Sequence, residues 1–377
     1  MKYNWQQKDW PQFEYRLNQF ENALFEFAEQ IGHVSGMLKS MPEEIKMEAI
    51  IDIMVAEAIK TSEIEGEHLS RRDVVSSIRN NLGLNQSHEY VKDKLSQGAG
   101  ELMVDVRKSF AKLLTEEKLF SWHKMLFKGN RKLTIGAWRK HTDPMQVVSG
   151  TIGKEKIHFE APPSSSLPKE MKKFINWFNE TAPHGKNEIK KAPVRSAIAH
   201  LYFETIHPFE DGNGRIGRAI AEKALSQTIG RPGLLSLSRT IEMDKRSYYD
   251  ALEKAQKSNE ITLWVQYFVH LILKAQKQTN EVIDFILKKS KFFNRYKNEL
   301  NERQLKVVKR MFDEGPAGFE GGMSAKKYMS ITKTSKATAT RDLQDLIEKQ
   351  ILKIEGGGRS THYILNIKST NSDHHKN

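Results

Sequence analysis

Apolar residues recur at steps of three and four along the first ninety residues, which is the spacing of one face of an α-helix. Two stretches follow this pattern, residues 20–38 and 43–66. Gly66 is the expected end of the second one, because glycine is favoured where a helix stops. Since the same spacing continues through residues 90–135, we expect an N-terminal region made of helices.

The pattern changes at residues 147–165, where β-branched runs alternate with glycines and end at a double proline. This composition predicts a short β-hairpin that leads into a loop. Helical spacing returns from residue 168 to about residue 290. Two apolar stripes mark this part, one of Val194, Ile198, Leu201, Tyr202 and Thr205 and one of Ile216, Ile220, Ala224 and Leu225.

The composition shifts again near residues 290–300, and short elements follow. Three helical segments and two strand-like segments joined by glycines are predicted at 302–312, 324–331, 336–350, 351–356 and 360–365. Three helices and a glycine-tipped hairpin in this order resemble a winged helix-turn-helix. The sequence therefore predicts a mainly α protein in four segments: an N-terminal helical region (1–95), a central core (96–292), a winged-helix domain (293–366) and a disordered polar tail (367–377).

The overall composition is that of an ordinary globular protein, with 38% hydrophobic and 28% charged residues in 377. No cysteine is present, which excludes disulfides and thiolate metal sites. The first residues lack the apolar core of a signal peptide, and no apolar run reaches the ~18 residues that span a bilayer. We therefore expect a cytoplasmic protein without a membrane segment. A formal net charge of +13 favours anionic partners.

The stretch HPFEDGNGRIGR, residues 207–218, differs from the helices around it. Gly212 and Gly214 allow a sharp turn and leave backbone N–H groups open at a helix start, which favours an anion. Arg215 and Arg218 share one face of the following helix, where two guanidiniums suit a polyphosphate.

Two further side chains of this stretch add chemistry. Asp211 offers the hard oxygen that Mg²⁺ takes beside phosphate oxygens, and His207 at the loop entrance can act as a base near neutral pH. The residues thus predict a phosphate cradle, a metal ligand and a base.

Two other motif assignments fit less well. GNGRIG (212–217) matches the dinucleotide fingerprint in letters, but that fingerprint follows a strand, and the preceding residues have helical spacing. An EF-hand is rejected because Arg215 and Ile216 stand where a ligand and a glycine are needed. The remaining alternative makes His207 a helix cap and the arginines surface charge.

Residues 207–218 match at every position the signature H-P-F-x-[DE]-G-N-G-R-x-x-R of the Fic family, whose members transfer AMP from ATP to protein hydroxyls. Residues 136–150 and 156–163 resemble the segment that carries the family's β-hairpin flap, and residues 247–256 resemble its adenine-side helix. The resemblance covers roughly residues 100–290 and implies a Fic-type helical core with that flap.

The resemblance also implies a role for each matching residue of the motif. His207 would deprotonate a Ser, Thr or Tyr hydroxyl of a target protein, Phe209 would anchor the loop, and Asp211 would bind Mg²⁺. The phosphate oxygens would be held by Gly212, Asn213 and Gly214, with Arg215 on the β-phosphate side and Arg218 at the γ-phosphate.

Residues outside the motif would complete the site. Tyr248, Tyr249 and Gln256 would line the adenosine pocket, although core packing stays open for the tyrosines. The flap would hold the target as an added strand through Ile157, His158 and Phe159.

TSEIEG, residues 61–66, resembles the family's inhibitory motif [ST]-x-x-x-E-[GN]. The resemblance implies that Glu65 pairs with Arg218 and occupies the place of the γ-phosphate. The other interpretation is that Glu65 is an ordinary solvated residue at a helix end.

The sequence thus predicts a protein adenylyltransferase that modifies a target protein and itself and is inhibited by Glu65. The expected partners are ATP and a target protein with a hydroxyl side chain. A homodimer with a second copy of this chain is left open. The winged helix either contacts DNA, through Lys333, Lys336, Arg341 and Arg359, or docks protein. Two alternatives stay open: a DNA-binding regulator with a nucleotide-sensing core, and a related enzyme that uses another donor or removes AMP.

Overall fold

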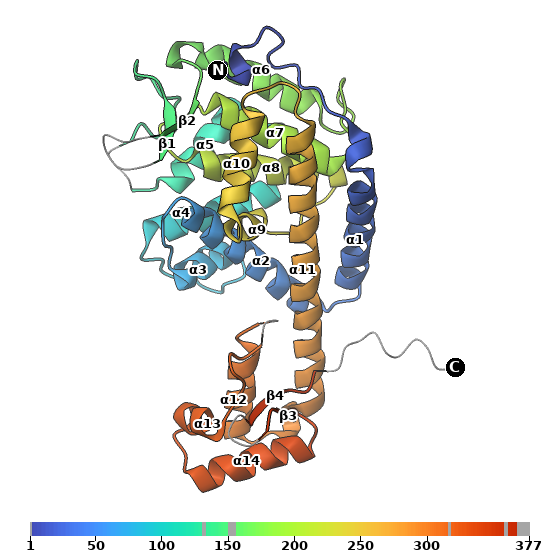
Figure 1. Cartoon of the computed structure of the whole chain (residues 1–377). Helices are drawn as coiled ribbons and strands as arrows, with labels where there is room; N and C mark the ends of the chain where they lie inside the picture. The colour runs from blue at the N-terminus through green and yellow to red at the C-terminus, as the bar shows by residue number, and fades with distance from the viewer. Residues whose placement is uncertain (1, 130–132, 150–155, 316–317, 358–360, 368–377) are drawn as a thin grey trace. The chain divides into compact units, whose positions relative to one another are not determined.

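The computed structural model describes residues 2–129, 133–149, 156–315, 318–357 and 361–367, which fold mainly into helices (Figure 1). Their contacts group into two compact units. The first holds Met1–Gly36 and Ile50–Thr279, and the second holds Met37–Ala49 and Asn280–Asn377. Three long helices extend across these limits along the chain, α1 (Glu21–Lys39), α2 (Glu43–Ile64) and α11 (Thr262–Tyr296).

The first unit contains the predicted central core. Its remaining elements are η1 (Asn4–Gln6), η2 (Leu17–Gln19), α3 (Arg71–Leu82), α4 (Lys94–Lys108), α5 (Glu116–Leu126), β1 (Gln146–Ser149), β2 (Lys156–Glu160), η3 (Ser164–Ser166), α6 (Leu167–Glu180), α7 (Ala192–Ile206), α8 (Asn213–Ile229), α9 (Leu237–Glu242) and α10 (Lys245–Ala255).

Helix α7 is the centre of this unit and packs along α8 (Figure 1). All residues of Ala192–Ile206 are buried, so the apolar stripe predicted from the sequence is part of a helix covered on every side. Buried polar groups of α7 find partners: Arg195 donates to the carbonyl oxygens of Phe178 at 2.7 Å and Ala224 at 3.0 Å. These bonds satisfy a guanidinium that would otherwise be costly to bury.

The predicted hairpin is present, with β1 and β2 antiparallel and Val147 opposite Phe159. Its tip, residues 150–155, lies outside the described residues. The side chains of β2 alternate, since Ile157 is 49% exposed whereas Phe159 is 2% exposed.

The second unit contains the C-terminal elements in the predicted order. They are η4 (Lys297–Glu299), α12 (Glu302–Phe312), α13 (Ala325–Thr332), α14 (Lys336–Glu348), β3 (Leu352–Glu355) and β4 (His362–Leu365). Met323 pairs with Tyr363 beside the β3–β4 hairpin, and a separate apolar cluster that includes Val307, Tyr328 and Leu343 fills the unit.

The segment limits at 95, 292 and 366 stay predictions, and α11 continues unbroken past residue 292. Arg359 and the tail from residue 368 lie outside the described residues. Among the helices that the structure describes, none is long and apolar enough to cross a membrane.

Candidate active site

The loop of residues 207–212 joins the end of α7 to the start of α8. Both of its ends have left-handed backbone conformations, with a φ of 49° at His207 and of 80° at Gly212. Glycine is required at 212, because a Cβ there would lie 2.7 Å from Cε2 of Phe127. Histidine is among the few other residue types that adopt this conformation.

Side chains inside the loop hold its shape. The Asn213 amide donates to the Phe209 carbonyl oxygen and accepts from the Phe209 N–H, both at 2.9 Å. The Phe209 ring is fully buried, in line with its expected anchoring role. Since the Asn213 side chain is engaged in this way, only its backbone remains to meet a phosphate.

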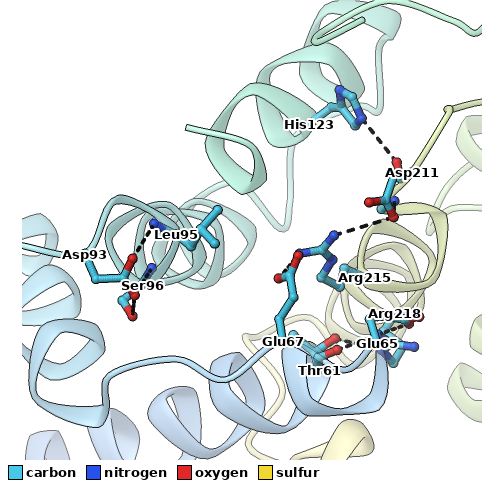
Figure 2. A network of polar contacts seen from close by, with 11 residues as sticks. Thr61, Glu65, Glu67, Asp93, Leu95, Ser96, His123, Asp211, Arg215 and Arg218 are labelled. Carbon is cyan, nitrogen blue, oxygen red and sulfur yellow. Dashed lines mark hydrogen bonds and ion pairs between the residues drawn. The ribbon is translucent and has the colours of Figure 1, made fainter. Parts of the chain in front are cut away.

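His123 of α5 supports the same loop and was not predicted. Its ring stacks on Phe209 at a centroid distance of 4.2 Å, and its Nδ1 accepts from the Gly136 N–H at 2.9 Å. Nε2 then carries the proton and donates to the Asp211 carbonyl oxygen at 3.2 Å (Figure 2). Burial lowers the pKa of His123 to about 4, so the ring stays neutral. The sequence carries no signal for this contact, because His123 lies within an ordinary amphipathic helix.

The start of α8 is a ready anion site. The Ile216 N–H donates to the Gly212 carbonyl oxygen at 3.0 Å. The N–H groups of the helical residues before Ile216 have no acceptor within the helix, because no helical carbonyl lies four residues before them. Gly214 has an ordinary helical backbone, and a Cβ there would meet Oε1 of Glu65 and would lie 3.1 Å from Nη1 of Arg218, so these side-chain ends would have to shift.

Arg218 is held by the end of α2, as Figure 2 shows. Its Nη2 lies 2.7 Å from Oε1 of Glu65 and donates to the Thr61 carbonyl oxygen at 2.9 Å, while its Nε donates to Thr61 Oγ1 at 2.7 Å. The Arg218 side chain is 1% exposed, whereas that of Glu65 is 29% exposed. The contact between Glu65 and Arg218 expected from the resemblance is therefore present, and Gly66 follows it with a φ of 81°.

Arg215 has a carboxylate partner of its own, which the sequence analysis missed. Glu67 forms an ion pair with its Nη1, and Asp211 Oδ1 lies 3.7 Å from its Nη2 (Figure 2). The guanidinium also lies over the Phe127 ring, 4.8 Å from the centroid. Both arginines are thus buried and paired, which corrects the alternative that they are surface charge.

Arg139 and Glu204 surround His207. Arg139 Nε donates to the His207 carbonyl oxygen at 2.9 Å and stabilises the left-handed turn, while Oε2 of Glu204 lies 3.9 Å from His207 Nδ1. Burial, with Arg139 nearby, lowers the pKa of His207 to about 4, so its imidazole is neutral and able to accept a proton. Burial raises the pKa of Glu204 to about 8. Neither Arg139 nor Glu204 was predicted.

The three residues expected at the adenosine pocket lie in different surroundings. Tyr248 is 1% exposed, belongs to the main apolar cluster and bonds His200 Nε2 through its hydroxyl at 2.6 Å. Tyr249 is 41% exposed and meets the Tyr248 ring edge-on. Gln256 is buried and donates to the Glu204 carbonyl oxygen at 3.3 Å. Tyr248 and Gln256 therefore pack in the interior, and Tyr249 is the one of the three with an exposed ring.

The three predicted flap residues also differ in exposure and in their contacts. Ile157 is exposed, and His158 Nδ1 lies 2.7 Å from Oε2 of Glu253 on α10. Phe159 is buried and meets the Tyr3 ring edge-on at 5.0 Å. Phe159 thus anchors the hairpin instead of facing a partner, because side chains alternate along a strand.

A family model described as the Fic/DOC family matches residues 113–225, and a model described as a domain of unknown function, DUF4172, matches residues 3–84. A probable protein adenylyltransferase of Aquifex aeolicus is 33% identical over 100 residues, 26% of this chain and 27% of that protein. A protein adenylyltransferase Fic of Nematostella vectensis is 22% identical over 198 residues, 52% of this chain and 38% of that protein. The chain therefore spans about a quarter to two fifths of these curated relatives.

Solved structures agree on the fold. A Fic family protein from Desulfovibrio desulfuricans superposes with a TM-score of 0.55 at 18% identity, covering 95% of this chain and 99% of that one. A Fic domain containing signaling protein from Bacteroides thetaiotaomicron superposes with a TM-score of 0.52 at 16% identity, covering 71% of this chain and 97% of that one. The chain thus has a Fic-type fold, and the match to the Fic/DOC family model at residues 113–225 includes the motif of residues 207–218.

Proposed function

We propose that this protein is an adenylyltransferase that transfers AMP from ATP to a hydroxyl of a target protein and to itself. One observation carries the proposal: two buried arginines lie on the first turns of α8, directly after a loop that begins with a neutral histidine. Guanidiniums and open N–H groups at a helix start bind polyphosphate, and a neutral imidazole accepts a proton. The similarity to protein adenylyltransferases supports the same activity.

The reaction assigns a task to each group. Arg218 would hold the γ-phosphate, Arg215 the β-phosphate side, and the N–H groups at the start of α8 the phosphate oxygens. The target hydroxyl oxygen forms a bond to the α-phosphorus, and the bond from that phosphorus to the bridging oxygen of the β-phosphate breaks. The hydroxyl proton goes to His207, and pyrophosphate leaves with the bridging electron pair.

Asp211 fits a Mg²⁺ ion that arrives with the nucleotide. Its side chain is 54% exposed at the mouth of the loop. The described residues contain no group of three or more metal-ligating side chains, so Asp211 is proposed as a ligand that acts together with the phosphates. Mg²⁺ is often bound in this way, through one or two carboxylates plus substrate phosphates and water. The ion would neutralise phosphate charge.

The end of α2 would keep the enzyme inhibited. Glu65 occupies the Arg218 guanidinium that the γ-phosphate needs, so ATP would bind poorly or in an unreactive position. The exposed Ile157 side of the hairpin would receive an extended target segment, whose backbone would add a strand. Tyr249, with its exposed ring, is the candidate contact for adenosine. Formation of a homodimer stays a prediction.

The decisive experiment incubates the full-length protein with α-labelled ATP and Mg²⁺ and measures added AMP by intact mass. Glu65→Gly should accumulate label on itself, and Glu65→Gly with His207→Ala should not. Label from another nucleotide donor, or release of AMP from pre-labelled protein without net transfer, would favour the related activities instead. No label in any variant, together with nucleotide binding, would favour a nucleotide sensor and contradict the proposal.

A further inference from the structure

The second unit carries a concentrated positive surface that the adenylyl-transfer site does not use. Residues 325–341 include five cations and no acidic residue. They form α13, a turn of residues 333–335 and the start of α14. Ser324 and Ser335 cap the two helices, each accepting the N–H three residues later. A turn of this length between two helices is that of a helix-turn-helix.

Helix α14 divides its residues sharply between two faces. The inner face packs Ala339, Leu343 and Leu346 into the unit core. The outer face is a continuous stripe at helical spacing, and its exposed residues are Lys336, Ala337, Thr340, Arg341, Gln344 and Glu348.

The two aspartates of α14 are both paired, and Asp342 is buried whereas the Asp345 side chain is partly exposed. Asp342 is 7% exposed and accepts hydrogen bonds from Arg303 and from the Tyr328 hydroxyl, at 2.8 and 2.9 Å. Asp345 accepts from Gln304 at 2.7 Å and from Lys349 at 2.6 Å. Both carboxylates therefore have partners within the unit, and the exposed residues in the first three turns of the outer face are cations, neutral polar residues and Ala337.

We propose that this outer face of α14 binds duplex DNA. Lys333 and Lys336 are exposed, and they are suited to phosphate contacts beside the helix start. Arg341 and Gln344 are the side-chain types that form bidentate contacts with guanine and adenine in the major groove, which admits one helix. A helix-turn-helix presents these positions of its second helix to the bases.

Other partners match this face less well. Single-stranded nucleic acid is held by stacking on exposed aromatic rings, and no aromatic residue of the second unit is among the strongly exposed apolar side chains in its described part. Protein interfaces depend on a buried aromatic or apolar anchor, whereas Ala337 is the one apolar residue of the stripe.

The test measures binding of the full-length protein to a labelled random-sequence duplex of about two helical turns (~20 base pairs). Affinity is followed between about 50 and 200 mM salt. Lys336→Ala with Arg341→Ala should weaken binding at least tenfold and reduce the slope of log affinity against log salt by about one, because Lys336 is the phosphate contact of the pair. The matched control, Lys291→Ala with Lys297→Ala, removes two exposed positive charges of the same unit and should bind like wild type.

Three results would overturn the proposal: no binding by wild type at the lowest salt, equal losses in both double variants, or tighter binding to single-stranded RNA or polyglutamate than to the duplex. Circular dichroism and self-modification should be unchanged in both variants, because these residues lie outside the proposed adenylyl-transfer site.

A second inference rests on the proposed function and concerns Glu67. Arg215 is 2% exposed, its Nη1 is paired with Glu67, and its Nε is buried without a hydrogen-bond partner among the described residues. A buried donor without an acceptor is costly, and a phosphate oxygen is the acceptor that the proposed reaction would supply. We infer that Glu67 blocks the β-phosphate position at Arg215, as Glu65 blocks the γ-phosphate position at Arg218.

ADP and ATP separate the two blocks, because ADP lacks the γ-phosphate. Binding to the full-length protein would be measured by calorimetry. Glu67→Ala should raise the affinity for both nucleotides about tenfold, whereas Glu65→Ala should raise the affinity for ATP alone. The control Glu63→Ala removes a carboxylate of the same segment that pairs with Lys60, and it should change neither affinity.

Unchanged ADP affinity in Glu67→Ala, alongside tighter ATP binding in Glu65→Ala, would reject the role of Glu67 and leave the proposed function intact. Failure of every variant to bind either nucleotide would reject both.

Discussion

The contact between Glu65 and Arg218 allows a quantitative prediction for Glu65→Gly. The two side chains are 2.7 Å apart, and the guanidinium is almost fully buried, so the bond is charge-assisted and poorly screened. Such a hydrogen bond contributes about 1.5–3 kcal/mol. A γ-phosphate must displace this carboxylate, and that free energy corresponds to about a ten- to hundredfold reduction in the population of productively bound ATP. AMP transfer by Glu65→Gly should therefore rise by at least ten times.

The assay is the rate of self-modification of the full-length protein with α-labelled ATP, with ATP affinity measured in parallel. Glu63→Gly is the matched control, since it places a glycine two residues away, in the last turn of α2, and removes a residue paired with Lys60 and not with the arginines. Adding Arg218→Ala to Glu65→Gly should abolish the gain, because both changes act at one contact. The inhibitory assignment is refuted if Glu65→Gly is no faster than wild type, or if Glu63→Gly accelerates transfer equally.

Three further predictions concern the groups around the loop. His207→Ala should abolish AMP transfer while ATP still binds. In Glu65→Gly the rate of AMP transfer should stay level from about pH 7 down to ~5.5, because burial lowers the pKa of His207 to about 4. Loss of activity with a midpoint near the ordinary histidine pKa of about 6.5 would contradict this. Asp211→Ala should lose Mg²⁺-dependent transfer without recovery at raised Mg²⁺; wild-type metal dependence would make Asp211 a loop-capping residue only. Burial raises the pKa of Glu204 to about 8, so this carboxyl keeps its proton in the folded state at neutral pH. Its contribution to the free energy of unfolding is therefore full below about pH 4.5 and is lost as pH rises through about 8, by up to ~1.4 kcal/mol per pH unit. Urea unfolding should show Glu204→Gln gaining stability relative to wild type across that range, and a constant difference would contradict the assignment.

Local patterns in the sequence determined most of the elements and the chemistry of the loop. Helical spacing marked α12, α13 and α14, and β-branched residues with glycines marked the hairpin of β1 and β2. The motif from His207 to Arg218 could be recognised because its turn conformation, open N–H groups and arginine spacing depend on residues close together in the chain. The contact between Glu65 and Arg218 was expected only through the resemblance to a known family.

Tertiary structure decided which side chains that are far apart in the sequence come into contact. Glu67 reaches Arg215, and His123 reaches the backbone of Asp211, only because α2, α5 and α8 pack together. Packing also assigned Tyr248 and Phe159 to the interior, since neither ring carries a local signal that separates a binding surface from a core position. Burial set the protonation of His207 and Glu204, because a pKa responds to desolvation and to neighbouring charges, and these exist only once the chain has folded.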